Sequence, residues 1–189
     1  MGGSYGTAAV NDAAGTLRKP QASVDSNGPH WFAVHTRYRF EKKVVAQLNY
    51  KRYEVYLPLR TEKHVWSDRH QVVTTALFPG YVFVHIDQSS AARRAVLQTA
   101  GLLGFVTFGG TVVPVPPAQI DHLQLLLQEK VLFSLHPFVQ VGQRMRIRGG
   151  CLDGLEGVLL QHEGKLVISI EMIQRSLAIE IQGYELDFV

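Results

Sequence analysis

The chain has 189 residues, of which 46% are hydrophobic and 19% charged, so it is long enough for one large domain or two small ones. This composition excludes fibrous and collagen-like proteins, and no apolar run approaches the roughly 18 residues that a membrane-spanning helix needs. The single cysteine, Cys151, excludes an intramolecular disulfide and favours a reducing, cytoplasmic compartment.

Charge is distributed unevenly along the chain. Residues 30–69 hold nine basic and four acidic residues, whereas residues 138–189 hold five basic and seven acidic ones. The asymmetry suggests two modules with different partners, the first a polyanion and the second a protein surface. Residues 1–29 are rich in Gly, Ala, Ser and Asn and have no apolar stretch before their late basic pair, so we expect a disordered leader rather than a signal peptide.

An N-terminal domain is predicted over residues 30–128. Period-two alternation predicts strands, and apolar spacing of three and four predicts helices. The predicted strands are 31–36, 53–57, 61–66, 69–76, 81–86, 104–108 and 111–115; the predicted helices are 37–52, 89–99 and the one that begins at the prolines 116–117. The helix at 37–52 has a basic outer face, and 61–76 is a hairpin with its turn at 67–68. The order resembles a ferredoxin-like α/β sandwich with an extra hairpin.

A second, smaller domain is predicted over residues 138–189, after a linker at 129–137. Strands are expected at 141–148, 158–161, 166–173, 176–181 and 186–189, separated by glycine turns. Five short strands of this kind form a small, SH3-like β-barrel. The fold class is therefore α+β.

Catalytic chemistry is not indicated by the sequence. The eight histidines show no helical i, i+4 pair and no acid at metal-ligand spacing, and Cys151 sits in a Gly-Gly-Cys turn without a paired base. We expect no enzyme, no cofactor and no metal.

The segment Leu-Phe-Pro-Gly-Tyr-Val-Phe at residues 77–83 is the most informative stretch. Its Pro-Gly turn holds Phe78 and Tyr81 in a fixed relation, with Trp31 as a possible neighbour. One interpretation is a core cluster; the other is an exposed aromatic pocket for a protein partner.

At these residues the chain resembles the NusG-like transcription elongation factors. The opening Trp-Phe-Ala-Val at 31–34, the basic helix and the Phe-Pro-Gly-Tyr-Val-Phe motif match a NusG N-terminal domain, and Val-Gly-Gln-Arg-Met-Arg-Ile at 141–147 with the following glycines matches a KOW domain. The resemblance covers residues 30–189. It implies a factor that binds RNA polymerase at the clamp helices and the opposite lobe, bridges the DNA channel, and suppresses pausing and termination.

The resemblance also implies site residues. Those expected to meet the clamp helices are Trp31, Phe78, Pro79, Gly80 and Tyr81; non-template DNA is expected at Arg37, Arg39, Lys43 and Lys51; and the polymerase gate loop at Arg93 and Arg94. For the two arginines a solvated basic face remains an alternative.

In the family, the KOW barrel recruits a small-subunit ribosomal protein or the termination factor Rho. The matching positions are Leu152, Leu155, Ile173 and Arg175. Departures from the housekeeping pattern, such as Cys151 and Ile173, leave Rho binding open and look more like the specialised, operon-dedicated paralogues of the RfaH, UpxY and LoaP types. β-branched residues favour a barrel that does not refold into helices. No signal for dimerisation is visible, so we expect a monomer without a membrane partner.

Two other functions are alternatives to a polymerase-binding factor. A ribosome- or RNA-associated KOW-domain protein without a polymerase role would predict a net basic barrel. An enzyme that uses Cys151 or a histidine lacks a paired base.

Overall fold

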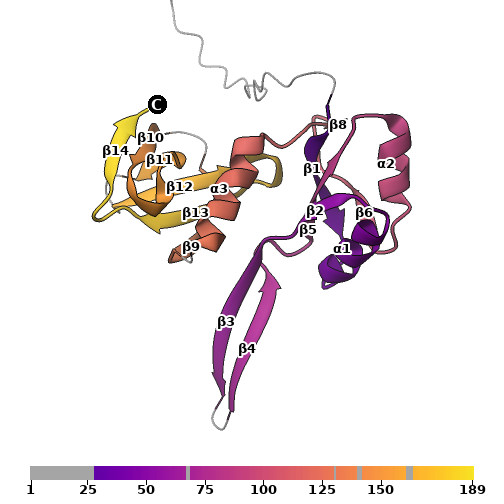
Figure 1. Ribbon diagram of the computed structural model, residues 1–189, viewed down its shortest axis with the longest axis horizontal. Helices are drawn as coiled ribbons and strands as arrows, with labels where there is room; N and C mark the ends of the chain where they lie inside the picture. Colours follow the sequence, from indigo (N-terminus) through magenta and orange to yellow (C-terminus); the bar gives the residue numbers. More distant parts are fainter. Residues whose placement is uncertain (1–27, 67–68, 130, 140–141, 161–163) are drawn as a thin grey trace, which may run out of the picture.

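The computed structural model describes residues 28–189 except 67–68, 130, 140–141 and 161–163. The leader expected at 1–29 lies outside the described residues, apart from 28 and 29, and so does the predicted hairpin turn. Two modules lie side by side, with the helix α3 (Pro117–Gln128) between them (Figure 1). The protein is a mixed α/β protein with few helices and many strands, as the sequence predicts.

The N-terminal module is built on a four-stranded antiparallel sheet in the order β2-β5-β1-β6. Helices α1 (Glu41–Tyr50) and α2 (Ser90–Leu97) supply the residues that pack on one of its faces. The strands are β1 (His30–Thr36), β2 (Glu54–Tyr56), β5 (Tyr81–Ile86) and β6 (Leu102–Phe105). The core on this face contains Phe32, Val34, Val44, Leu48, Val82, Val84, Ile86 and Val96.

The opposite face of the sheet contributes to a second core. Because successive strand residues point to opposite faces, Trp31, Ala33 and Phe83 all face this side. They belong to one apolar cluster with Ile120 and Leu123 of α3, and the cluster continues into residues 145–179 of the C-terminal part of the chain. The sheet is therefore buried on both sides, which explains the unbroken apolar runs at residues 31–34 of β1 and 81–84 of β5.

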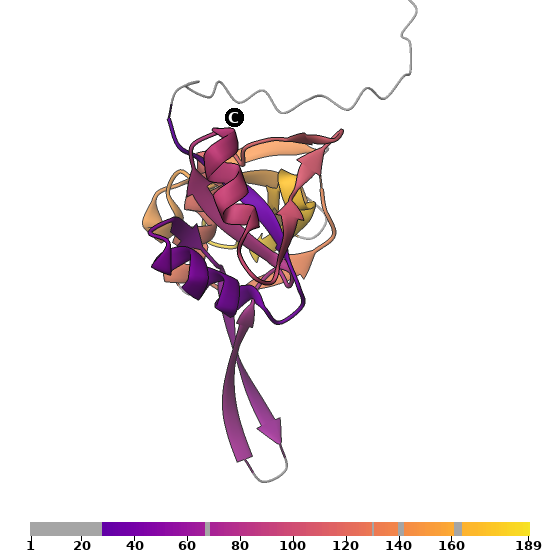
Figure 2. The same cartoon turned by 90° about the vertical axis from the view of Figure 1, so that its right-hand side faces the viewer.

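A long hairpin leaves the body of the N-terminal module (Figures 1 and 2). Its strands are β3 (Leu59–Trp66) and β4 (Arg69–Ala76), which pair in register from Leu59↔Ala76 to Trp66↔Arg69. At its base, the Lys42 ammonium of α1 donates to the Thr74 carbonyl at 2.9 Å. A much shorter hairpin, β7 (Thr107–Phe108) with β8 (Thr111–Val112), precedes α3.

The C-terminal module is a six-stranded antiparallel sheet in the order β14-β10-β11-β12-β13-β9. The five strands expected from the sequence are β10 (Gln143–Arg148), β11 (Glu156–Leu160), β12 (Lys165–Ile170), β13 (Arg175–Glu180) and β14 (Glu185–Phe188).

The sixth strand, β9 (Phe133–His136), differs from the expectation because it lies inside the segment assigned to the linker. It pairs with the edge of β13, and Phe133 packs against the core. The chain just beyond β9 is held as well, since the Val139 amide donates to Ser176 Oγ at 3.3 Å and Ser169 Oγ donates to the Val139 carbonyl at 2.9 Å. Four residues are too short a run to reveal a strand by alternation.

Candidate functional site

The aromatic motif of the sequence forms a tight turn that leads into β5. The Tyr81 amide donates to the Phe78 carbonyl at 3.2 Å, with Pro79 and Gly80 at the two central positions. Gly80 has a φ of 83°, the left-handed conformation that a type II turn requires at this position. The turn therefore depends on the Pro-Gly pair.

Gly80 also connects this turn to the start of α1. Its amide donates to Oε1 of Glu41 at 2.7 Å, and its carbonyl accepts from the Thr36 amide at 2.9 Å. Glu41 is only 6% exposed. Nothing in the sequence pattern indicates this role of Glu41, because the two residues lie 39 positions apart.

The aromatic rings of the expected polymerase site come together in space, but they are largely buried. Phe78 is 2% and Trp31 9% exposed, and both belong to the core cluster that α3 helps to form. Tyr81 is half-buried and packs against the same cluster, while Pro79 is exposed. Of the two interpretations of the motif, the core cluster describes Phe78, and the surface of the turn is presented by Pro79 and Tyr81.

Three residues outside the motif extend this face of the sheet. Tyr56 of β2 stacks on Phe83 with ring centroids 6.3 Å apart, and burial raises its pKa well above the usual range. His85 stacks on Trp31 at 4.8 Å, and its Nδ1 lies 2.7 Å from Oε2 of Glu54. The signal that could have revealed them is the register, since all three side chains lie on the same face as Phe83 and Trp31.

The four residues expected to face DNA divide into two groups. All four side chains are exposed, and Lys43 Nζ lies 4.8 Å above the ring of Phe40. The Lys51 ammonium instead donates to the Ala95 carbonyl and to Thr99 Oγ1, both at 3.0 Å. Lys51 thus joins the end of α1 to the end of α2, a structural role that the sequence did not indicate.

The two arginines of α2 also differ. Arg93 is half-buried, and its Nε donates to the Gln88 carbonyl at 3.0 Å, just before the helix. Arg94 is exposed. Ser89 caps the helix, with its Oγ accepting from the Ala92 amide at 3.2 Å. Of the two, Arg94 is therefore the more accessible to a partner.

The residues expected to form the partner surface of the barrel are mostly inside it. Leu152 and Leu155 are fully buried and Ile173 is 4% exposed, whereas Arg175 is exposed. The 3-10 helices η1 (Gly150–Leu152) and η3 (Glu171–Ile173) turn the apolar side chains toward the core. Of these four residues, the three apolar ones are buried, and the charged Arg175 is the one at the surface.

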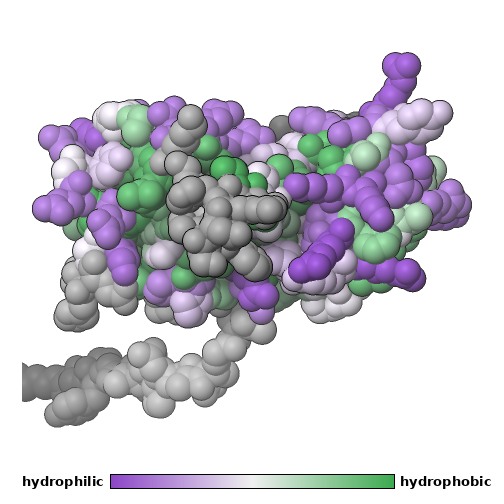
Figure 3. All heavy atoms as spheres, turned by 90° about the horizontal axis from the view of Figure 1, so that it is seen from below, coloured by the Kyte–Doolittle hydropathy of each residue, from purple (hydrophilic) through white to green (hydrophobic). Residues whose placement is uncertain are grey.

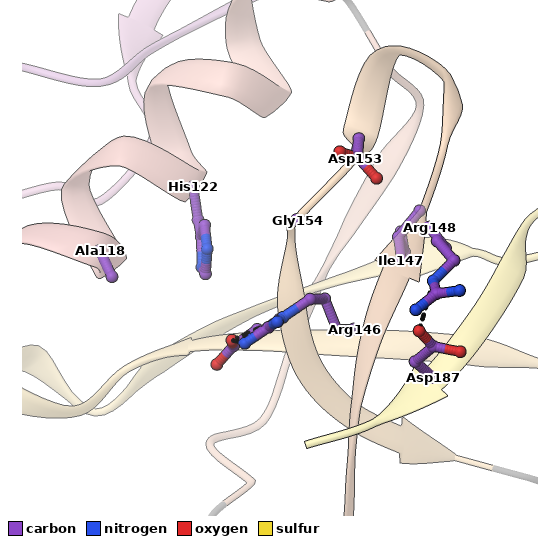
Figure 4. Close-up of a pocket in the computed structure, with 9 residues that line it drawn as sticks. Ala118, His122, Arg146, Ile147, Arg148, Asp153, Gly154 and Asp187 are labelled. Atoms are coloured by element: carbon purple, nitrogen blue, oxygen red, sulfur yellow. Dashed lines mark hydrogen bonds and ion pairs between the residues drawn. The ribbon is translucent and has the colours of Figure 1, made fainter.

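The two modules contact each other through α3. The Glu171 amide of the C-terminal module donates to Gln119 Oε1 at 3.2 Å. A pocket between the two modules is lined from α3 by Ala118 and His122 and from the C-terminal module by residues that include Arg146, Asp153 and Gly154 (Figure 4).

His122 points toward the barrel strands across this pocket (Figure 4). Burial lowers its pKa from the ordinary value of 6.5, against the opposite pull of the Glu156 and Asp121 carboxylates and of the Gly154 backbone. The contact between the modules therefore favours the neutral imidazole. Nothing in the sequence pattern distinguished His122 from the other seven histidines.

Within the described residues, no group of three or more His, Cys, Asp or Glu side chains is placed to hold a metal ion. No helix in the described part of the chain is long and apolar enough to cross a membrane.

Comparison with known protein families gives a match for the N-terminal module. A family model described as "Transcription termination factor nusG" matches residues 29–124, which is just over half of the 189 residues. The chain belongs to the NusG family. This membership confirms the family resemblance that the motifs of both modules indicated, and with it a transcription termination/antitermination factor.

The similarity to individual proteins extends beyond the N-terminal module and covers more than four fifths of this chain. The transcription termination/antitermination protein NusG of Staphylococcus carnosus is 27% identical over 175 residues, which cover 85% of this chain and 96% of that protein. The corresponding protein of Lactococcus lactis is 28% identical over 170 residues, covering 83% and 91%. A solved structure described as "Domain interaction in Thermotoga maritima NusG" has 21% identity and a TM-score of 0.49, covering 83% of this chain and 96% of that chain.

Proposed function

We propose that this NusG-family protein binds RNA polymerase through its N-terminal module, bridges the clamp helices and the opposite lobe across the DNA channel, and suppresses pausing and termination. The observation that carries the proposal is the family match over residues 29–124, which contain the whole aromatic motif. A factor that contacts both sides of a closed channel binds the closed state better than the open one, and so shifts the polymerase toward processive elongation.

The clamp helices would meet the turn at 78–81. Pro79 is exposed and Tyr81 half-buried, so these two provide the contact surface. Gly80 sets the shape of the turn, and the buried rings of Trp31 and Phe78 support it from below. This division of roles follows from burial, because a ring that is 2% exposed touches a partner only if the core opens.

Two basic surfaces would complete the polymerase and DNA contacts. Arg37, Arg39 and Lys43 are exposed and suit the phosphates of the non-template strand, whereas Lys51 is engaged within the protein. Arg94, with Arg93 beside it, is the candidate for the gate loop.

The C-terminal module would recruit a second partner. We assign a ferredoxin-like sandwich to residues 30–128, supported by the sheet order β2-β5-β1-β6, and a KOW barrel to residues 138–189 with 129–137 as the connection. Arg175, exposed at the start of β13, is the residue best placed for a small-subunit ribosomal protein or Rho. The departures of the C-terminal module from the housekeeping pattern, such as Cys151 and Ile173, favour an operon-specific antiterminator. The role is non-enzymatic, and the protein acts as a cytoplasmic monomer.

Single-round transcription across an intrinsic terminator tests the proposal. Wild-type protein added to a bacterial polymerase should increase read-through and shorten pauses, and Tyr81→Ala should abolish most of this effect. Tyr50→Ala is the matched control, because Tyr50 is 90% exposed at the end of α1 and has no assigned role. Unchanged termination with the wild-type protein at saturating concentration would contradict the proposal.

A further inference from the structure

The connection between β1 and α1 displays an aromatic ring in solvent. Residues 37–40 form a turn closed by the Phe40 amide, which donates to the Arg37 carbonyl at 3.0 Å. Tyr38 occupies the second position of this turn and is 69% exposed. Exposure alone does not single out Tyr38, since Tyr50 is 90% exposed; what distinguishes Tyr38 is the backbone and the charges around it.

The backbone of this turn is held in an unfavourable conformation. Arg39, at the third position, has a φ of 63°, where glycine is ordinarily found. Contacts with Gly101 nevertheless hold the turn in place. The Arg37 amide donates to the Gly101 carbonyl at 2.8 Å, and the Phe40 ring lies against Gly101. A Cβ atom at position 101 would stand 2.6 Å from Phe40 Cδ1, so this packing requires glycine there. Strained backbone that the surroundings hold in place is typical of functional sites.

Positive charge surrounds the exposed ring. The guanidinium carbon of Arg39 lies 5.3 Å from the centroid of the Tyr38 ring, and the exposed side chains of Arg37 and Lys43 belong to the same segment. The acidic residue of this segment, Glu41, is buried and bonded to the Gly80 amide. Seen from below, the surface is a mixture of hydrophilic residues and smaller apolar patches (Figure 3).

An exposed aromatic ring among cations is the arrangement that single-stranded nucleic acids recognise, since bases stack on rings and phosphates pair with arginine and lysine. An apolar protein partner would instead need a continuous apolar patch, and the neighbours of Tyr38 are charged.

We propose that Tyr38 is a stacking platform for one unpaired base of single-stranded DNA, with Arg37 and Arg39 on the flanking phosphates. The inference rests on the proposed function, which brings α1 to the non-template strand, and it adds a residue that reads a base face rather than a phosphate. Stacking of this kind is tolerant of sequence.

The test is fluorescence anisotropy of the full-length protein with a 5′-fluorescein-labelled (dT)12 at several NaCl concentrations between 50 and 200 mM. Tyr38→Ala should weaken binding about 5- to 150-fold, the range that loss of one base–aromatic stack gives, without changing the slope of log K against log[salt]. Tyr38→Phe should bind like the wild type, because the ring remains. Arg39→Gln should reduce the magnitude of the slope by about 0.7.

Tyr50→Ala is the control, since it removes an even more exposed tyrosine, which lies at the C-terminal end of α1, away from the turn that holds Tyr38. Wild-type affinity in Tyr38→Ala, equal losses in Tyr50→Ala, or no binding by the wild type at 50 mM salt would overturn the inference. So would Tyr38-dependent binding of (U)12 RNA with none of (dT)12.

A parallel pull-down with DNA-free core RNA polymerase separates the two proposals. Tyr38→Ala should be retained like the wild type. If the wild type binds polymerase but DNA affinity does not depend on Tyr38, the inference alone fails. If DNA affinity depends on Tyr38 while the wild type does not bind polymerase, the proposed function fails and the stacking site stands.

Discussion

The backbone amide of Gly80 donates to the buried carboxylate of Glu41 at 2.7 Å, and this bond joins the aromatic turn to the first residue of α1. The proposed polymerase surface and the proposed DNA surface are therefore mechanically connected. A change in either residue should affect the whole N-terminal module.

Replacement of Glu41 tests this connection. Glu41→Ala leaves the Gly80 amide without its acceptor and should lower the free energy of unfolding by about 1–3 kcal/mol, the usual cost of an unsatisfied buried group. Glu41→Gln keeps an acceptor oxygen and should lose less. Urea denaturation followed by circular dichroism measures both, and equal stability of all three proteins would show that the bond contributes nothing.

Gly80→Ala tests the left-handed conformation of the turn. The nearest atom to an added Cβ is the Thr36 carbonyl oxygen at 3.8 Å, so there is room and the penalty comes from the φ of 83° alone. We expect a loss of about 1–2 kcal/mol. Gly104→Ala is the matched control: it has open space and no positive φ, so its stability should be unchanged or slightly higher. If Gly104→Ala lost more stability than Gly80→Ala, the left-handed conformation of Gly80 would not be what the turn depends on.

The prediction for Lys51 separates a structural cation from a DNA-binding one. Lys51→Met removes two hydrogen bonds to the end of α2 and should cost about 0.5–1.5 kcal/mol of stability, while the salt dependence of DNA binding stays the same. Lys43→Met should do the opposite, with unchanged stability and a slope smaller by about 0.7. If the salt dependence of DNA binding also became weaker in Lys51→Met, Lys51 would have to contact DNA.

The stability of the protein should fall below pH 6.5 because of His122. The folded state holds this imidazole at a pKa below its ordinary value of 6.5, so unfolding takes up a proton as the pH drops below 6.5. The stabilisation that neutral His122 contributes is thus complete above pH 6.5, and it diminishes until the pH reaches the lowered pKa of the folded state.

Urea denaturation at pH 7.5 and pH 5.5 checks this, with His122→Gln as the comparison. The variant lacks the titrating group, so its loss of stability between the two pH values should be smaller than that of the wild type. An equal or larger loss in the variant would show that other groups set the pH dependence.

Much of the fold could be predicted from the sequence, because strands and helices show as hydrophobic periodicity among neighbouring residues. Strand β5 occupies residues 81–86 as its alternation indicated, and β4 occupies 69–76. The first helix was predicted from residue 37 but begins at Glu41, since Arg39 adopts a left-handed conformation that no glycine or proline announces. Strand β9 was missed because its stability comes from the edge of β13 rather than from its own four residues.

The functional side chains were harder to predict, because burial and long-range bonds are not visible in one sequence. Lys51 looks like any basic residue on a helix face, yet its partners lie 44 and 48 positions away. Leu152 and Leu155 follow a glycine turn and were expected at the surface, but Leu152 at the end of the 3-10 helix and Leu155 just beyond it are both fully buried. Tyr38 is the converse case, an apolar ring that stays outside.

The central claim is that the turn at 78–81 binds the clamp helices, and the affinity of the full-length protein for core RNA polymerase tests it most directly. Biolayer interferometry should compare the wild type with Tyr81→Ala, because Tyr81 is half-buried and its loss disturbs the core less than loss of Phe78. Tyr50→Ala serves as control. We predict that Tyr81→Ala weakens binding by about 2–4 kcal/mol while Tyr50→Ala binds like the wild type. Wild-type affinity in a folded Tyr81→Ala would contradict the claim.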